Sequence, residues 1–309
     1  MSNAINGKEI IVHYAAETGT GQSMYDIDHY SNVNIQATAQ LLDYITNEKN
    51  TIEKIVVASS RSIYGEGKYK CKTHGVVYPK ARKEQDLLNG DFGVKCPHCG
   101  VDAELLLTDE NSKIHPASIY GITKQVQEQM ITLMGESLGI STIGLRYQNV
   151  YGPGQSLKNP YTGILSIFST RILNGNSINI FEDGKESRDF VYIDDVVDAT
   201  YRAIKSERKE NEVYNVGTGI GTTVEEVTKL LYKFYGQEEN YSISGNFRLG
   251  DIRHNIADLT KIKEGLGFTP MVGFDEGINR FCSWVKGQEV EEDKFQASLE
   301  EMKEKGLLK

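Results

Sequence analysis

The sequence has few of the features that would place a protein in a membrane, outside the cell or on nucleic acid. No apolar run approaches the ~18–20 residues that cross a bilayer, and no signal-peptide pattern opens the chain. Acidic side chains outnumber basic ones, 43 to 34, and the net charge is −9 without a basic patch, so we expect no nucleic-acid partner. Six prolines exclude a proline-rich disordered chain, and four cysteines in 309 residues are too few for a disulfide scaffold. We therefore expect a cytoplasmic protein with no membrane partner.

Short runs rich in Ile and Val alternate with amphipathic segments in the first half of the chain. The runs 9–16, 54–59 and 142–147 are typical of buried strands, and the segments 24–45 and 120–138 have helical spacing. This β-α-β-α-β order predicts an α/β fold with a doubly wound parallel Rossmann-like sheet over residues 5–150. Shorter elements over 151–288 predict a smaller α+β lobe that binds substrate. The charged segment 289–309 is predicted to be a loosely docked helix or tail.

A Tyr-x-x-x-Lys pattern at Tyr120 and Lys124 is a candidate for acid–base chemistry. Positions i and i+4 share one face of a helix, and a nearby ammonium lowers the pKa of a phenol, as a general base for a hydroxyl requires. The pattern alone decides nothing, because it recurs at Tyr64 and Tyr201. Ser60 strengthens it, since this serine ends a predicted buried strand, where open parallel sheets place their chemistry.

Three cysteines and a histidine are grouped in a segment between these candidate residues. The sequences Cys71-Lys-Thr-His74 and Cys96-Pro-His-Cys99 form a C-x₂-H…C-x₂-C array with 21 residues between the pairs. This array supplies four ligands for tetrahedral zinc and predicts a structural, zinc-ribbon-like insertion over 67–114, with a lid or interface role. The alternatives are a loop with unrelated thiols, or a site in which His98 or His115 replaces His74.

Several longer blocks follow one another along the chain. They are VVASSRSIYG at 56–65, PASIYGITK at 116–124, LRYQNVYGP at 145–153, GKESRDFVYIDD at 184–195, NVGTG at 215–219 and RLGD at 248–251. Together with the alanine pair at 15–16 and an asparagine at 34, they resemble the extended short-chain dehydrogenase/reductase family. Within it, the resemblance is to the NAD-dependent nucleotide-sugar epimerases and dehydratases.

The resemblance implies an enzyme that transiently oxidises a nucleotide-diphosphate sugar. Tyr120 would be the acid/base, Lys124 its partner, and Ser60 a hydrogen-bond donor to the reacting oxygen. The cofactor would be NAD, with NADP not excluded; its ligands would be Ala15, Ala16, Asn34, Tyr120, Lys124 and Tyr147. The substrate ligands would be Thr18, Ser23, Asn149, Arg188, Arg248 and Asp251.

One departure from the family pattern narrows the expected reaction. The 4,6-dehydratases carry an Asp-Glu pair directly after the catalytic Ser or Thr, whereas Arg61 and Ser62 stand there in this chain. The resemblance therefore favours a 4-epimerase, with a 4-keto reductase of a deoxysugar as the alternative. The segment 17–23 resembles that of enzymes like dTDP-L-rhamnose 4-epimerase, and UDP-glucose 4-epimerase-like proteins are the other close resemblance.

The Gly-rich unit with which the family begins is not found. No G-x-x-G-x-x-G occurs, so we expect the chain to enter the fold at its fourth strand, without the turn that cradles the dinucleotide pyrophosphate. A second hypothesis is therefore a non-catalytic remnant that binds a nucleotide sugar or a protein partner. The resemblance also implies a homodimer formed by the helices near 24–45 and 120–138.

Overall fold

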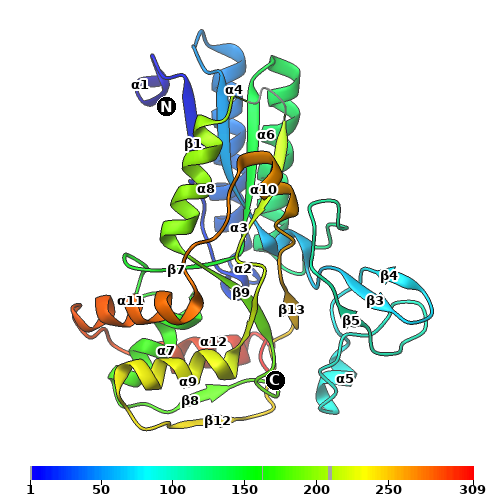
Figure 1. Ribbon diagram of the computed structural model, residues 1–309, viewed down its shortest axis with the longest axis vertical. Helices are drawn as coiled ribbons and strands as arrows, with labels where there is room; N and C mark the ends of the chain where they lie inside the picture. Colours follow the sequence, from blue (N-terminus) through cyan, green and yellow to red (C-terminus); the bar gives the residue numbers. More distant parts are fainter. Residues whose placement is uncertain (1, 162, 208–210) are drawn as a thin grey trace.

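A four-stranded parallel sheet forms the upper part of the molecule in the computed structural model, which describes residues 2–161, 163–207 and 211–309 (Figure 1). Its order is β1-β2-β6-β10. The strands are β1 (Ile10–His13), β2 (Lys54–Ser60), β6 (Ser141–Tyr147) and β10 (Glu212–Val216). The two central strands are buried nearly throughout, as their apolar runs predict, and the expected α/β fold with a parallel sheet is confirmed.

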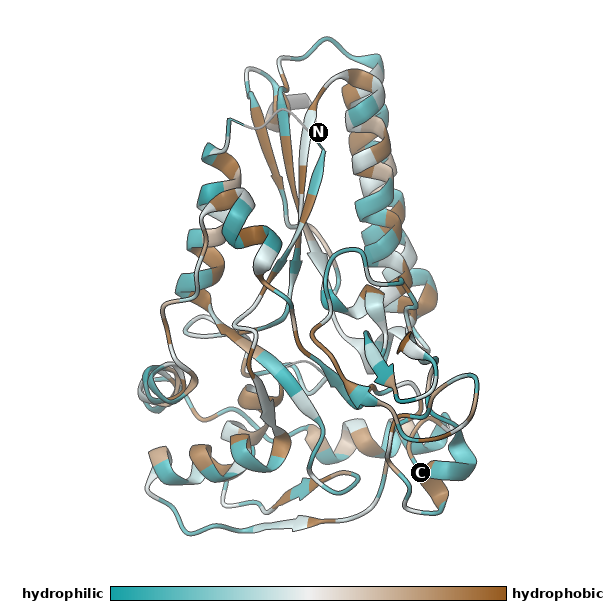
Figure 2. Ribbon diagram, turned by 45° about the vertical axis from the view of Figure 1, so that its right-hand side comes forward, coloured by the Kyte–Doolittle hydropathy of each residue, from teal (hydrophilic) through white to brown (hydrophobic). Residues whose placement is uncertain are grey.

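Helices cover both faces of this sheet. One face carries α4 (Ala37–Asn47) and α6 (Ile119–Leu138), and the other carries α8 (Ile193–Lys205) and α10 (Thr260–Leu266) (Figure 1). Ser118 caps α6 by accepting from the amide of Gly121 at 3.1 Å, and Gly139 ends it in the left-handed conformation. Figure 2 shows the strands as mainly hydrophobic and the helices as mixed, consistent with a core between the layers. The short helices on the way into these layers are α1 (Ser2–Ile5), α2 (Thr20–Ser23), α3 (Ile27–Tyr30) and the π-helix η1 (Ser31–Gln36).

The second half of the chain does not form a separate lobe throughout, which corrects the expected boundary at 150. Strand β10 and helices α8 and α10 return to the first sheet, because their apolar faces complete its core. The rest forms the lower layer in Figure 1. Its strands are β7 (Asn149–Tyr151), β8 (Ile178–Ile180), β9 (Ser187–Tyr192), β11 (Gly221–Thr223), β12 (Tyr241–Ile243) and β13 (His254–Asn255). Its helices are α7 (Ile164–Leu173), α9 (Val224–Tyr235) and α11 (Phe274–Lys286).

The segment 67–114 is a small unit beside the carboxyl end of the sheet, at the right of Figure 1. It follows the 3₁₀ helix η2 (Arg61–Tyr64) and contains β3 (Tyr69–Cys71), β4 (Gly75–Val77), α5 (Glu84–Leu88) and β5 (Glu104–Leu105). Its strands pair antiparallel in the order β4-β3-β5. Only five buried apolar residues form its core, and two of them are Cys71 and Cys96.

The prediction of a loosely docked C-terminus is wrong. Helix α12 (Phe295–Glu304) buries Phe295, Leu299 and Met302, and Leu308 completes the same cluster. The last residue then pairs with Phe247 through two backbone hydrogen bonds, of 2.8 and 3.0 Å. The helix is docked because its few apolar residues share one face, so the high charge of the segment lies on the outside.

Strand β1 lies at the edge of the parallel sheet and pairs with β2 within the part of the chain that the structure describes. Its Ile10 and Val12 side chains are 39% and 36% exposed, and the following Tyr14 is 51% exposed. An exposed apolar edge of this kind is a template for a further strand. Among the helices of the described residues, none combines the length and the hydrophobicity that a membrane span requires.

Candidate active site

A cavity of about 840 Å³ opens where β2 and β6 end. Residues from the parallel sheet, helix α6 and the lower layer line it together. This is the place where ligands bind in open α/β sheets. The predicted site residues in its lining are Ala16, Thr18, Ser60, Tyr120, Lys124, Tyr147, Asn149, Arg188, Arg248 and Asp251.

Ser60 and Tyr120 meet in this cavity although they are sixty residues apart in sequence. Ser60 ends β2, and its Oγ accepts hydrogen bonds from the Ser62 hydroxyl at 2.8 Å and the Ser62 amide at 3.2 Å. Tyr120 lies in the first turn of α6, where its amide donates to Ser23 Oγ at 3.0 Å. Both side chains line the cavity. A hydroxyl and a phenol therefore face the same space.

The pKa of Tyr120 is raised, because burial disfavours the phenolate more than its surroundings favour it. The nearby Ser60 hydroxyl and the positive charge of Arg61 act in the opposite direction. The expected lowering by Lys124 is not seen in this structure. The Lys124 ammonium donates instead to Gln127 Oε1 at 2.7 Å, one turn further along α6.

Lys124 is nevertheless a buried cation of the cavity wall. Burial lowers its pKa to about 8, and the nearby Glu128 carboxylate opposes that shift. Gln127 holds the ammonium while its own amide donates to Thr38 Oγ1 at 2.9 Å and to the Ala15 carbonyl at 3.2 Å. This arrangement aligns α6 with the end of β1 and leaves further ammonium hydrogens for a ligand in the cavity.

Arg61 is a site residue that sequence reasoning did not assign to the site. Its Nε donates to Asn149 Oδ1 at 2.7 Å, and burial followed by the charge of Arg188 lowers its pKa to about 9. The signal was its position directly after Ser60. In the sequence, Arg61 argues against a dehydratase because it replaces an acidic residue. In the structure, its guanidinium also lies in the cavity that Ser60 and Tyr120 line.

Arg188 and Arg248 supply positive charge to the cavity from the lower layer. Arg188, on β9, donates to the backbone carbonyls of Ile252 at 2.7 Å and Arg253 at 3.0 Å. Arg248 lies over the ring of Phe181, 4.8 Å from its centroid. Both guanidiniums are therefore anchored in place and suited to a diphosphate, which a planar forked donor binds well.

Three predicted ligands lie outside the cavity lining. Asn34 is fully buried, and its amide bonds the Glu17 backbone and Thr123 Oγ1, so it shapes the turn after β1. Ser23 is also buried and holds the Tyr120 amide. Ala15 uses its carbonyl to accept from Gln127, while Ala16 faces the cavity. Asn34, Ser23 and Ala15 therefore hold neighbouring parts of the site in place without lining the cavity.

Further lining residues were not among the predicted ligands, although Gln148 and Glu186 lie within the sequence blocks 145–153 and 184–195. Among the described residues, the buried amide of Gln148 and one carboxylate oxygen of Glu186 have no hydrogen-bond partner. Burial, with a contribution from Glu182, raises the pKa of Glu186 to about 7. Phe295 reaches the lining from α12. Unpaired buried polar atoms of this kind are expected where a ligand completes the hydrogen bonding.

The predicted metal ligands converge in the insertion. One ligand atom from each of Cys71, His74, Cys96 and Cys99 lies within 4.8 Å of the others. Cys71 Sγ is 3.5 Å from His74 Nδ1 and 3.7 Å from Cys99 Sγ. Three sulfurs and an imidazole at these distances form a closed, four-ligand set, which suits zinc.

The fold and the site define an α/β enzyme of the Rossmann type with a Ser/Tyr/Lys group at the carboxyl edge of its sheet. Residues 3–82 and 99–217 match the model of the NAD dependent epimerase/dehydratase family. The chain belongs to that family. The interval that the match omits, 83–98, lies within the insertion.

The proteins to which this chain is similar include several nucleotide-sugar epimerases. The chain is 35% identical over 280 residues to dTDP-L-rhamnose 4-epimerase of Burkholderia thailandensis, covering 90% of this chain and 75% of that one. Among solved structures, UDP-glucose 4-epimerase of Thermotoga maritima with UDP-glucose superposes with a TM-score of 0.71 at 31% identity, over 90% of this chain and 77% of that one. The Thermus thermophilus UDP-glucose 4-epimerase complex with NAD gives 0.70 at 26% identity, over 91% and 78%.

Proposed function

We propose that this protein is an NAD-dependent 4-epimerase of nucleotide-diphosphate sugars. The observation that carries the proposal is that Ser60 and Tyr120 line one cavity together with the anchored Arg188 and Arg248. A sugar hydroxyl at the first pair and a diphosphate at the second would occupy that cavity together. Asn149, Asp251 and Thr18 are further proposed substrate ligands.

The described residues fit the nicotinamide side of NAD. Lys124 has unused ammonium hydrogens in the cavity, and Tyr120, Tyr147 and Ala16 line the same wall. NAD, when bound there, supplies a ring that accepts a hydride from the sugar and returns it. No G-x-x-G-x-x-G turn for the dinucleotide pyrophosphate occurs in this sequence. Alternatively, this chain binds nucleotide sugar without catalysis.

The protein side chains would handle the proton of the sugar 4-hydroxyl. Ser60 would bind the hydroxyl oxygen, and Tyr120 phenolate would remove its proton as the C4 hydrogen departs as hydride. The resulting 4-keto sugar would turn over in the cavity, anchored by its diphosphate at Arg188 and Arg248. Tyr120 would then return the proton as hydride adds to the opposite face of C4. A 4-keto reductase is the alternative, since it would use the same three residues.

Incubation of the chain with NAD and either UDP-glucose or a dTDP-deoxysugar tests this function. Proton NMR should show the C4 epimer accumulating to equilibrium without net consumption of NAD. Titration of NAD in a calorimeter separates the alternatives. Binding of nucleotide sugar without NAD binding or product would contradict an enzyme in this chain and favour the binding-only alternative.

For the four-ligand cluster we propose structural zinc. The small core of the insertion, in which Cys71 and Cys96 are two of five buried apolar residues, supports a metal that holds the unit together. One zinc per chain is expected by elemental analysis, and none in Cys96→Ser. Cys282→Ser, at the buried cysteine outside the cluster, is the matched control.

We also propose that the protein is a cytoplasmic homodimer. Leu133 on α6 is 63% exposed, and Ile122 and Leu138 of the same helix are exposed as well. A symmetric packing of the α4 and α6 layer would cover these side chains. Sedimentation velocity should give twice the chain mass of 34.6 kDa, and a stable monomer would contradict the dimer.

A further inference from the structure

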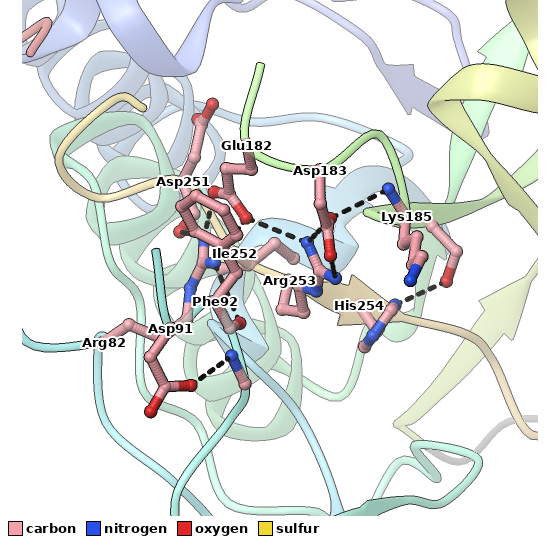
Figure 3. A network of polar contacts seen from close by, with 12 residues as sticks. Arg82, Asp91, Phe92, Glu182, Asp183, Lys185, Asp251, Ile252, Arg253 and His254 are labelled. Carbon is pink, nitrogen blue, oxygen red and sulfur yellow. Dashed lines mark hydrogen bonds and ion pairs between the residues drawn. The ribbon is translucent and has the colours of Figure 1, made fainter. Parts of the chain in front are cut away.

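The insertion 67–114 sends one arginine into the wall of the cavity. Arg82 lies between the two halves of the Cys/His cluster in sequence, and its side chain is only 3% exposed. Its guanidinium donates to both carboxylate oxygens of Glu182, at 2.6 and 2.7 Å, and to the Asp251 backbone carbonyl at 2.9 Å (Figure 3). Glu182 and Asp251 both line the cavity, so a single side chain joins the insertion to two of its walls.

Glu182 is held in an unusual backbone conformation. Its φ is 49°, and no other non-glycine residue that the structure describes has a positive φ. Its carboxylate accepts a further hydrogen bond from Arg253 at 3.0 Å, and Arg253 in turn binds both carboxylate oxygens of Asp183 (Figure 3). The forked contact from Arg82 therefore helps to keep a strained residue at the cavity surface in one position.

The segment 251–253 connects Arg82 to Arg188 through hydrogen bonds of its backbone. The Asp251 carbonyl binds Arg82, and the Arg253 amide donates to Glu66 Oε2 at 2.8 Å, at the entrance to the insertion. The carbonyls of Ile252 and Arg253 bind the Arg188 guanidinium. The segment 251–253 is thus fixed from the insertion side while its carbonyls orient a cationic side chain of the cavity. This is a contiguous chain of polar contacts between two parts of the fold.

A second connection reaches Arg248. Leu87 and Phe92 of the insertion form an apolar cluster with Phe247, and Leu249 packs against it. Phe247 and Leu249 flank Arg248 in sequence. The insertion therefore contacts both sequence neighbours of Arg248. Through the segment 251–253 it is also connected to the carbonyls that orient Arg188.

The electrostatic balance of the network depends on Arg82. Glu66, Glu182 and Glu186 are buried carboxylates in this region, and burial raises the pKa of Glu66 and of Glu186 to about 7. Arg82 pairs with Glu66 at 3.3 Å as well as with Glu182. Without the charge of Arg82, Glu182 would keep Arg253 as a cationic partner, but Glu66 would lose its ion pair. The excess negative charge would then compete with an incoming diphosphate for the Arg188 guanidinium.

We propose that the metal-bound insertion is a fixed wall of the nucleotide-sugar site, and that Arg82 is a positioning residue through which it sets affinity for the diphosphate. This inference rests on the proposed function, because it takes Arg188 and Arg248 as the diphosphate ligands. Zinc at Cys71, His74, Cys96 and Cys99 then controls substrate binding without touching substrate.

Calorimetric titration of UDP and of dTDP into the full-length, zinc-loaded protein tests the proposal without requiring turnover. Arg82→Ala should weaken binding at least tenfold while zinc content stays at one per chain. Arg82→Lys should recover part of the affinity, since lysine restores the charge but not the forked contact. Lys83→Ala removes an exposed positive charge at the adjacent position and should leave affinity unchanged.

Removal of the metal tests the proposal a second time, without any amino-acid substitution. Chelation of zinc from the unaltered protein should weaken UDP binding at least tenfold, and stoichiometric zinc should restore it. Unchanged affinity in either Arg82→Ala or the zinc-depleted protein would overturn the proposal while leaving the proposed function intact. Failure of the unaltered, zinc-loaded protein to bind either nucleotide would instead overturn the proposed function and this inference with it.

Discussion

Glu128 and Arg146 form a buried, two-pronged ion pair between helix α6 and strand β6. The Arg146 Nε and Nη2 atoms lie 3.0 and 2.6 Å from the two Glu128 carboxylate oxygens. The remaining nitrogen of Arg146 donates to Tyr64 Oη at 2.7 Å and to the Glu110 carbonyl at 3.0 Å. The helix that carries Tyr120 and Lys124 is therefore fixed to the sheet one turn beyond Lys124.

Removing one partner of this pair should destabilise the fold strongly. Glu128→Ala leaves the Arg146 guanidinium buried without its counter-ion, and we expect a loss of about 3–5 kcal/mol in the free energy of unfolding. Urea denaturation followed by circular dichroism measures it. Glu136→Ala, at an exposed position of the same helix, should change stability by less than about 0.5 kcal/mol. Equal stabilities of the two variants would contradict the role assigned to the pair.

Tyr120→Phe should abolish epimerisation while leaving UDP binding unchanged. The variant keeps the ring but removes the group that exchanges the proton, and general acid–base catalysis contributes about 10²–10⁴-fold. Initial rates by NMR and affinity by calorimetry separate the two effects. Tyr201→Phe is the matched control, since Tyr201 belongs to the same Tyr-x-x-x-Lys pattern but is exposed on α8. A rate for Tyr120→Phe within twofold of the parent would exclude Tyr120 as acid/base.

Stability should fall as the pH drops from 6.5 toward 4, because of His13. Burial lowers its folded-state pKa to about 4, with a further contribution from the charge of Lys124. In that window the unfolded chain binds a proton that the folded protein does not, so unfolding becomes progressively more favourable. The contribution of this one residue approaches about 3 kcal/mol at pH 4.

Urea denaturation at a series of pH values checks this assignment. His13→Asn should flatten the dependence between pH 6.5 and 4. His29→Asn, at an exposed histidine, should retain the slope of the parent protein. Parallel pH profiles for the parent and His13→Asn would show that His13 is not responsible. His254, whose pKa burial also lowers to about 4, should account for part of the remaining slope.

Phe295→Ala should destabilise the protein and weaken nucleotide binding together. Phe295 is buried in the C-terminal cluster, stacks with Arg171 and reaches the cavity lining. Loss of the ring should cost about 3–5 kcal/mol of unfolding free energy. Gln296→Ala changes the exposed neighbour and should be neutral. Unfolding and UDP titration indistinguishable between the two variants would show that α12 is no part of the site.

The layered fold follows largely from the sequence. Buried strands such as Lys54–Ser60 carry continuous apolar runs, and Ser118 and Gly139 mark the ends of α6. Patterns of this kind involve residues close together in sequence, so they can be recognised without knowledge of the tertiary contacts. The C-terminal helix was misjudged because Phe295, Leu299 and Met302 are a sparse signal until Tyr25, Ile167 and Phe181 are brought against them.

The α/β alternation and the four candidate Cys/His ligands can be predicted from the chain, because they depend on local periodicity or on fixed spacing. The candidates Ser60, Tyr120 and Lys124 rest on the resemblance of longer sequence blocks to a known family. Which of the predicted site residues face the cavity depends on how the layers of the fold pack. Asn34 and Ser23 lie behind it, whereas Arg61 and Glu186 lie within it. The same holds for Arg82, whose partners Glu182 and Asp251 are 100 and 169 residues away in sequence. Such contacts arise from how the layers pack, and no pattern within a single segment encodes them.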